Sequence, residues 1–251
     1  MTPVTKWAVL GDSCTGTSHR TRNTPCQDAF RYEAFGEFAE WLVIAVADGA
    51  GSAAHSEIGA KLVCDEFISR VPNIEPDKLA NRDEIIELFA TVRDTVIAEA
   101  ERLNAVPREL ACTVLLCVIG PMTATFAQLG DGAIVVRGSE EFRTVFWPEP
   151  SEYANATDFL TEDRFREAIQ FATMSESICE LAVLTDGLQR LALDFTTRQP
   201  HRAFFQPFFE RLRVETEPTT LVEPFREFLD SARVNDRTDD DKTLVIAIRQ
   251  Q

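Results

Sequence analysis

The amino-acid sequence predicts an α+β protein in which helices lie outside a mixed β-sheet. Unbroken apolar runs of strand length, such as Trp41–Ala47 and Thr243–Ile248, indicate buried strands. One long stretch, Asp83–Leu103, repeats its apolar residues at the helical period. Strands and helices come in groups and do not alternate regularly, which argues against a parallel sheet built from repeated strand–helix–strand units.

The composition is that of an acidic globular protein with 251 residues and a net charge of −16. This charge argues against nucleic acid or an anionic membrane as the main partner, and it suits a protein that binds cations. We find no leader-like segment and no apolar run long enough to cross a bilayer. The six cysteines form no Cys-x-x-Cys pair, which favours reduced thiols and a cytoplasmic location. We expect one domain over residues 1–251.

The first half of the chain is expected to contain two strands and two helices. Trp7–Leu10 is a strand, and Gly11–Pro25 is a polar loop that follows it. Trp41–Ala47 is a buried strand, and helices over Glu57–Val71 and Asp83–Leu103 come next. The apolar positions expected to be buried are Ile58, Leu62, Phe67 and Ile68 on the first helix, and Ile85, Ile86, Phe89, Val92, Val96 and Ala100 on the second.

The second half is expected to begin with a meander of three strands. These strands are Thr113–Ile119, Thr123–Gln128 and Ala133–Arg137. Gly120-Pro121 and Leu129–Gly132 are typical of the turns that would join them. An irregular insert at about 138–177, with a short helix near Arg164–Phe171, is expected to follow. The remaining elements are strands at Leu181–Thr185 and Thr243–Ile248 and helices at Arg202–Leu212 and Leu221–Ala232.

Three aspartates lie where apolar runs meet turns. Asp48 and Asp186 each follow a buried run and precede a glycine. Asp241 precedes the last run, and its neighbour Asp240 is the alternative there. A rigid strand directs such a side chain, and glycine lets the backbone approach a ligand. Carboxylates far apart in sequence and placed at strand edges therefore predict a site for a hard divalent cation.

Four motifs in a fixed order surround these aspartates. They are Pro25-Cys26-Gln27-Asp28-Ala29, Ala47-Asp48-Gly49-Ala50-Gly51, Leu129-Gly130-Asp131-Gly132, and the closing pair Thr185-Asp186-Gly187 and Asp240-Asp241-Lys242-Thr243. In this order the chain resembles the metal-dependent protein phosphatases of the 2C type, the PPM family, and in particular a compact bacterial branch. Glu152-Tyr153-Ala154-Asn155 also resembles the insert of that branch. The resemblance extends from about Gly11 to Ile248.

The resemblance implies a fold and a set of metal ligands. The fold is α+β, a sandwich of two mainly antiparallel sheets flanked by helices in four layers, αββα. Two Mg²⁺ or Mn²⁺ ions are implied at one end of the sandwich, with a weaker third ion. The implied ligands are Asp48, the Gly49 carbonyl, Asp186 and Asp241, with Asp131 and Asp186 holding the third ion.

The activity implied by the resemblance is hydrolysis of phosphoserine and phosphothreonine in a protein substrate, opposite a Ser/Thr kinase in bacterial signalling. Two ions lower the pKa of a bridging water and clamp the phosphoryl oxygens. The resulting hydroxide attacks phosphorus without a phosphoenzyme, and Asp28 is implied to orient the water. The particular phosphoprotein and the oligomeric state are left open.

The sequence departs from better-known members of this family. Ala50 stands where many members carry a His proposed as general acid, and Gln27 stands where some carry Glu. The phosphate-binding Arg lies just upstream of the first motif in many members, and Arg20 and Arg22 are the candidates here. We favour Arg22, which is nearer to that motif. His19 is a candidate for the missing acid and for a second phosphate contact, because imidazole titrates near neutrality.

Two other functions fit parts of the sequence. A non-catalytic phosphoprotein-binding or regulatory domain would explain the absent His and Glu, but it has no reason to keep clustered carboxylates. Cys14–Thr21 fits the phosphate loop of cysteine-dependent phosphatases, with Cys14 as nucleophile and Arg20 as phosphate ligand. Such a loop needs a helix that begins at the Arg. Asn23-Thr24-Pro25 disfavours one there.

Overall fold

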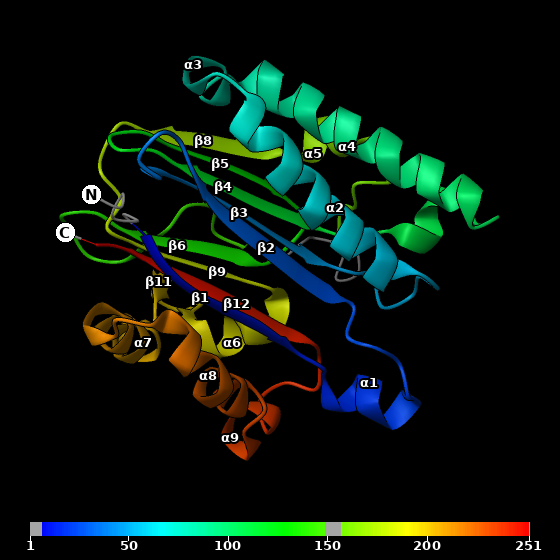
Figure 1. The fold of residues 1–251 in the computed structure, drawn as a ribbon. Helices are drawn as coiled ribbons and strands as arrows, with labels where there is room; N and C mark the ends of the chain where they lie inside the picture. The colour runs from blue at the N-terminus through cyan, green and yellow to red at the C-terminus, as the bar shows by residue number, and fades with distance from the viewer. Residues whose placement is uncertain (1–6, 149–156, 251) are drawn as a thin grey trace.

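The computed structural model describes residues 7–148 and 157–250, and in that part of the chain two five-stranded sheets stack face to face (Figure 1). Helices cover both outer faces. Every strand pairing in the described residues is antiparallel. The four-layer αββα sandwich is therefore confirmed, and the mixed sheet expected from the order of elements is wrong. No helix of the described ranges is long and apolar enough to span a membrane.

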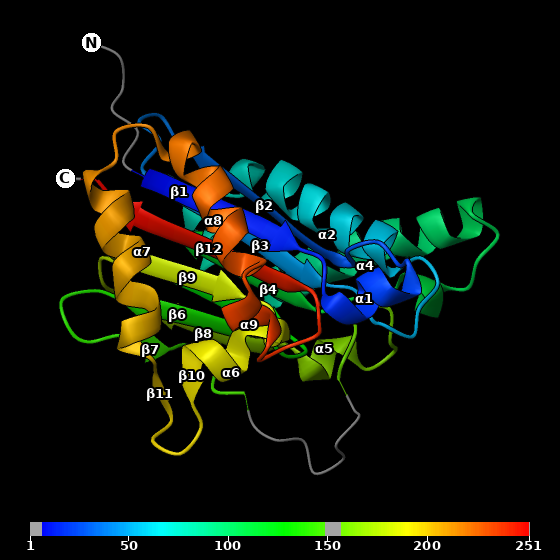
Figure 2. The ribbon, with the colours of Figure 1, turned by 90° about the horizontal axis from the view of Figure 1, so that it is seen from below.

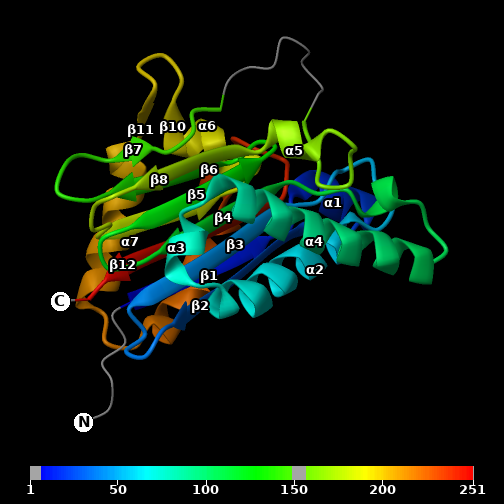
Figure 3. The same cartoon turned by 90° about the horizontal axis from the view of Figure 1, so that it is seen from above.

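The first sheet has the strand order β2-β3-β4-β5-β8, and helices α2 and α4 lie on its outer face (Figure 3). The strands are β2 Asp28–Phe35, β3 Trp41–Asp48, β4 Val114–Ile119, β5 Ala124–Leu129 and β8 Gln170–Met174. The helices on this side are α2 Ser56–Arg70, α3 Pro76–Leu79, α4 Arg82–Arg102 and α5 Phe165–Ala168.

The second sheet has the order β1-β12-β9-β6-β7, and helices α7 and α8 lie on its outer face (Figure 2). The strands are β1 Trp7–Cys14, β6 Ala133–Arg137, β7 Arg143–Thr144, β9 Glu180–Leu184 and β12 Lys242–Arg249. The remaining elements are α1 Thr17–Arg22, α6 Gln189–Ala192, α7 Arg202–Val214, α8 Val222–Leu229, α9 Ala232–Asn235 and the small ribbon of β10 Leu193–Asp194 and β11 Gln199–Pro200. Short 3-10 turns cover Val71–Asn73, Pro107–Leu110, Asp186–Leu188 and Pro218–Leu221.

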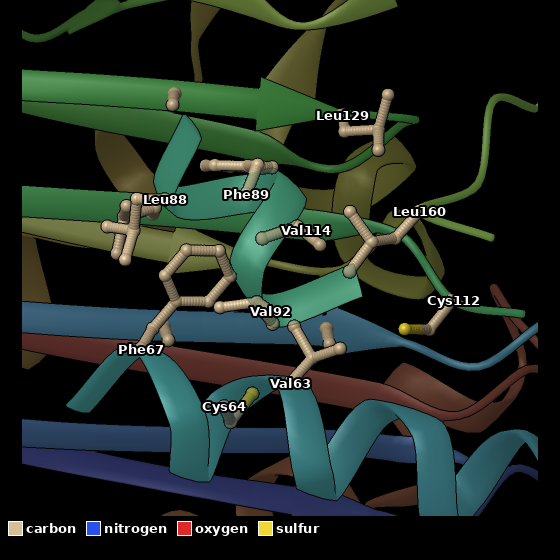
Figure 4. Packing of buried hydrophobic residues seen from close by; sticks show 14 of the residues in the cluster. Val63, Cys64, Phe67, Leu88, Phe89, Val92, Cys112, Val114, Leu129 and Leu160 are labelled. Carbon is tan, nitrogen blue, oxygen red and sulfur yellow. The ribbon is translucent and has the colours of Figure 1, made fainter. Parts of the chain in front are cut away.

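Apolar side chains fill three layers, one between the sheets and one under each set of helices. Figure 4 shows the layer under α2 and α4, where Phe67 and Phe89 meet with ring centroids 4.8 Å apart. Burying each such side chain contributes about 1.5–3 kcal/mol. The expected stripe on α4 is buried throughout. On α2 the expected Ile58, Leu62 and Ile68 are only partly buried.

The buried face of α2 consists of smaller residues than the sequence pattern suggested. It contains Gly59, Ala60, Val63 and Cys64 besides Phe67. A Cβ on Gly59 would lie 2.1 Å from the Leu110 carbonyl oxygen, so the helix packs too closely for larger side chains there. Close packing therefore decides which face of this helix is buried.

The stretch Gly11–Pro25 is not a loop. β1 continues to Cys14, whose partner in the ladder is Lys242 of β12, and α1 follows it. The hydrogen bonds between β1 and β12 keep this segment in the sheet although its sequence is polar. The chain also contains β2, a strand that the sequence analysis did not predict, paired along its whole length with β3.

The expected three-strand meander is wrong. β4 and β5 form a hairpin, but β6 pairs with β9 and β7 in the other sheet. Gly130 and Gly132 have φ of 88° and 110°, which other residues rarely adopt. The turn between them thus carries the chain from one sheet to the other, and Asp131 lies at this crossing.

The expected insert at about 138–177 is only partly irregular. It contains β7, the short helix α5 and β8, which pairs with β5 and forms an edge of the first sheet. β8 has only five residues, none of them fully buried, so it carries little apolar pattern. Glu152–Asn155 lies outside the described residues.

Candidate active site

The strand register brings aspartates from both sheets to one end of the sandwich. Asp28 at the start of β2 lies directly opposite Asp48 at the end of β3. Asp186 begins the turn after β9, and Asp240 precedes β12. Asp131 lies at the crossing between the sheets. Figure 1 shows α1 beyond this end of the strands.

A cavity of about 290 Å³, here called the catalytic cavity, opens at this end of the sandwich, and Asp28 lies beside it without lining it. The carboxylates that line it belong to Asp48, Asp131, Asp186 and Asp240, and Gly49 also lines it. The fold has therefore brought four carboxylates from distant parts of the sequence into one hollow.

Asp241 does not line the catalytic cavity, and Asp240 takes the place expected for it. The side chain of Asp241 is 2% exposed and fully engaged by protein donors. Its Oδ1 accepts from the Gly16 N–H at 2.6 Å, and its Oδ2 accepts from the Gln27 N–H at 2.6 Å. The His19 Nδ1 lies 2.8 Å from the same Oδ2. The ligand role of Asp241 stays a prediction, and Asp240, the alternative named from the sequence, is the one of the two that lines the cavity.

Burial disfavours the ionised form of the carboxyl groups at the catalytic cavity. Burial raises the pKa of Asp28 to about 8, although the hydroxyls of Thr185 and Thr243 each donate to its Oδ2 at 2.8 Å. Burial, with Asp131 adding repulsion, raises the pKa of Asp186 to about 6. Burial also raises the pKa of Asp48 well above its usual value, as do Asp28 and Asp186. Such a site gains free energy from a bound cation.

Two buried carboxylate oxygens of this group of aspartates have no hydrogen-bond partner among the described residues. They are Asp28 Oδ1 and Asp186 Oδ1. Asp131 is better satisfied, because the Thr157 hydroxyl donates to its Oδ2 at 3.2 Å, and burial raises its pKa. Gly49 donates its N–H to the Gln27 carbonyl at 3.1 Å, and a Cβ there would lie 2.7 Å from that oxygen. Only glycine fits at this position.

The donor set fits Mg²⁺ or Mn²⁺. In the described residues no three His, Cys, Asp or Glu side chains converge as a ready-made metal cage. Mg²⁺ does not need such a cage, since it keeps several waters and takes only one or two carboxylates. The unpartnered Oδ1 of Asp186 and the four carboxylates in the lining match that preference.

The three basic candidates before the first motif occupy different places. His19 and Arg22 line the catalytic cavity. Arg20 does not, because its guanidinium donates to Asp230 at 2.6 Å. His19 is 4% exposed and is fixed by Asp241. The preference for Arg22 over Arg20 therefore agrees with the geometry.

Cys14 has the wrong surroundings for a nucleophile. It lies in β1, and its side chain packs in the apolar layer under α7 and α8. Burial raises the pKa of its thiol, whereas a nucleophilic thiol needs a lowered one. The cysteine-dependent mechanism with Cys14 and Arg20 is therefore wrong for this site.

Sequence reasoning missed the two threonines that support Asp28. Thr185 follows β9, and Thr243 lies in β12, so both come from the sheet that does not carry Asp28. Each stands within a motif that was singled out for its aspartate. Hydroxyl residues beside such aspartates were the available signal, but only the tertiary fold shows what they contact.

A family model described as protein phosphatase 2C matches residues 15–229. The chain belongs to the protein phosphatase 2C family. It is a protein phosphatase of the 2C type, and phosphatases of this family depend on metal ions in general.

Known relatives of this protein phosphatase 2C chain cover nearly all of it. It is 35% identical over 248 residues to serine/threonine-protein phosphatase 3 of Escherichia coli K12, which covers 96% of this chain and 98% of that protein. Among solved structures, the serine/threonine phosphatase Stp1 of Staphylococcus aureus has a TM-score of 0.67 at 16% identity and covers 100% of this chain and 98% of that one. The S. agalactiae serine/threonine phosphatase has a TM-score of 0.69 at 14% identity, with 97% and 100% covered. These structures share the fold.

Proposed function

We propose that this serine/threonine protein phosphatase hydrolyses its phosphoprotein substrate with two Mg²⁺ or Mn²⁺ ions held by Asp48, the Gly49 carbonyl, Asp186 and Asp240. Asp131 and Asp186 would hold a weaker third ion. One observation carries the proposal: four carboxylates from both sheets line one cavity, and a buried oxygen of Asp186 has no partner. When bound, the ions supply an activated water and neutralise the phosphoryl oxygens.

Asp28 is proposed to orient the attacking water. Its Oδ2 is fixed by the hydroxyls of Thr185 and Thr243, while its buried Oδ1 remains without a partner. A carboxylate held by one oxygen presents the other in a defined direction. That free oxygen can accept a hydrogen bond from water and set the line of attack on phosphorus.

His19 is proposed as the proton donor to the leaving oxygen, and Arg22 as the phosphate ligand. The contact between His19 Nδ1 and Asp241 fixes the imidazole ring at the wall of the catalytic cavity. Its second nitrogen can then exchange a proton with the substrate. The guanidinium of Arg22, on the same wall, can make two parallel charge-assisted bonds to phosphate. The substrate would be a protein phosphorylated by a Ser/Thr kinase.

The decisive experiment compares hydrolysis of an aryl phosphate, a phosphothreonine peptide and a phosphotyrosine peptide with Mn²⁺ and with EDTA. We expect turnover only with the ion, and faster release from phosphothreonine than from phosphotyrosine. Asp48→Asn should abolish turnover and weaken Mn²⁺ binding in calorimetric titration. Turnover that persists in EDTA, or a fully active Asp48→Asn enzyme, would overturn the proposal.

A further inference from the structure

Two more cavities extend the catalytic cavity along one side of the molecule. The near cavity, of about 560 Å³, shares Asp186 and Asp240 with the catalytic cavity. The far cavity, of about 520 Å³, shares Arg190 and Arg237 with the near cavity. The three cavities therefore follow one another, each sharing residues with the next, and are here called the groove. Its far part is bounded by α6, α7, α8 and α9, which lie on the same face of the second sheet (Figure 2).

The far cavity is basic, although the protein as a whole is strongly acidic. Arg190, His201, Arg233 and Arg237 line it, and no acidic residue does. The three arginines are exposed, and none of them has an ion-pair partner within the described residues. In a chain of net charge −16, three neighbouring arginines without acidic partners form a local site for an anion.

The wall of the far cavity is aromatic. Phe204 and Phe208 of α7 and Phe228 of α8 line it while remaining only half-buried. Their ring centroids lie 5.0 to 6.1 Å apart, with rings steeply inclined to one another. Accessible aromatic rings beside arginines are the combination enriched where proteins bind other polypeptides.

The near cavity has a different character. Asp239 joins Asp186 and Asp240 there, opposite Arg190 and Arg237. The negative charge is therefore concentrated at the catalytic end of the groove and the positive charge at the far end. A ligand that fits both ends carries a phosphate for the catalytic cavity and, some distance along the chain, an acidic group for the arginines.

We propose that this groove binds the substrate segment beside the phosphorylated residue and selects a segment with one acidic and one aromatic or large aliphatic side chain. The inference rests on the proposed function, because the groove starts at the catalytic cavity. The acidic side chain binds Arg233 together with its neighbours Arg190 and Arg237, where carboxylate–guanidinium bonds are charge-assisted. The apolar side chain packs on Phe204, Phe208 and Phe228. A polypeptide is the occupant because its phosphorylated residue lies in the catalytic cavity while the rest of the chain must leave it.

The test uses the full-length enzyme with Mn²⁺ and a set of phosphothreonine peptides of equal length. One Glu and one Phe are moved stepwise through the positions on either side of the phosphothreonine, and Lys and Ala replace them in the matched peptides. We expect at least one arrangement to raise kcat/KM about tenfold over its Lys and Ala counterpart, equal to about 1.4 kcal/mol. Aryl phosphate, too small to reach the far cavity, reports on the catalytic centre separately.

Two variants and one control test whether the peptide preference arises in the far cavity. Arg233→Glu should remove the advantage of the Glu peptide, measured as the ratio of its kcat/KM to that for aryl phosphate on the same variant. Arg82→Glu, at an exposed position on α4, changes the net charge equally and should keep the advantage. Ala203→Trp fills the far cavity from an exposed position and should remove the advantage of Phe.

Binding of the dephosphorylated peptide, measured by calorimetry, separates this inference from the proposed catalysis. One outcome would contradict the catalytic proposal and support the groove. In it, aryl phosphate is not hydrolysed, the peptide still binds, and Arg233→Glu abolishes that binding. If the parent enzyme shows no preference at any position, or if Arg233→Glu and Arg82→Glu keep the same preference, the groove does not bind substrate.

Discussion

At the scale of single residues, Asp240 and Asp241 are neighbours in the chain but have separate tasks. Asp240 lines the catalytic cavity, while Asp241 is buried and accepts from two backbone N–H groups and contacts His19. The first position can therefore be assigned to ion binding. Asp241 connects the turn before α1, the segment before β2 and the imidazole of His19.

Substitution at each position should separate these tasks. Asp240→Asn removes a charge from the cavity, so Mn²⁺ affinity should fall while the free energy of unfolding of the metal-free protein rises or stays constant. Asp241→Asn places an amide N–H against a protein N–H, which costs about 1–3 kcal/mol of stability. It should lower kcat and leave Mn²⁺ affinity largely intact. Calorimetry and chemical denaturation measure both quantities, and an equal loss of affinity in the two variants would contradict the assignment.

Arg22 and Arg20 provide a second comparison at this scale. Arg22→Ala should lower kcat/KM for phosphopeptides by an amount equal to about 2–4 kcal/mol of transition-state stabilisation, since an electrostatic contact to the transferring group is lost. Arg20→Ala should stay near the parent value, because that guanidinium pairs with Asp230 outside the cavity. Mn²⁺ affinity should be unchanged in both. Parent-like kinetics for Arg22→Ala would show that another group holds the phosphate.

At the scale of elements, the turn between β1 and α1 packs directly on the segment that leads into β12. A Cβ on Gly16 would lie 2.3 Å from the carbonyl carbon of Asp240 and 2.4 Å from the Asp239 oxygen. The conformation of Gly16 itself is ordinary, with φ of −65°. Contact with the neighbouring backbone therefore excludes a side chain there.

Gly16→Ala should thus displace the segment that carries Asp240. Forcing a methyl group into this contact costs about 1–3 kcal/mol of folding free energy, and Mn²⁺ affinity should fall with it. Gly51→Ala is the matched control, because its Cβ would meet only the Gln27 Oε1, at 4.0 Å. Urea denaturation and Mn²⁺ titration of the two variants measure the difference. The reverse ranking would mean that the turn can move without disturbing the ligand.

The elements also show which features can be predicted from sequence. The buried strands β3, β4 and β12 and the helix α4 carry strong periodic or continuous apolar patterns, and their positions were predicted within one or two residues. β2 was missed because it mixes apolar and charged residues without a continuous run, and the end of β1 was missed because it is polar. Tertiary pairing holds both in the sheets. The crossing at Gly130–Gly132 was mistaken for a hairpin because a glycine turn looks the same in both cases.

The sequence also indicated residues of the candidate site, and their roles stay predictions. Asp48, Asp131 and Asp186 line one cavity as their motifs suggested. The choice between Asp240 and Asp241 depends on the direction of each side chain. A run of consecutive aspartates has no sequence pattern from which that direction can be predicted.

At the scale of the whole molecule, stability should depend on ions and pH together. The folded-state pKa values of Asp28 and Asp186, about 8 and about 6, exceed the unfolded value of about 3.9. A raised folded pKa contributes stability below the unfolded pKa, and this contribution is lost as pH rises through the folded pKa. In EDTA, the free energy of unfolding should therefore fall as the pH rises from about 3.9 to about 8, and level off at higher pH.

Mn²⁺ should reverse this loss, because ions replace protons on the carboxylates. A hundredfold excess over Kd adds about 2.7 kcal/mol. The Tm increase caused by Mn²⁺ should grow with pH in the parent and be much smaller in Asp186→Asn. Thermal melts at several pH values with Mn²⁺ and with EDTA test this, and equal increases in the two proteins would remove Asp186 from the site.

The proposed ligands come from both sheets, with Asp48 ending β3 in one and Asp186 and Asp240 flanking β9 and β12 in the other. Ions bound by them would join the two halves of the sandwich. The supply of divalent ions in a cell would then set how often the sheets separate and expose their interior to proteases. Ion starvation would lower the abundance of this phosphatase as well as its turnover, so phosphorylation would persist after the ions return, until new protein has been made.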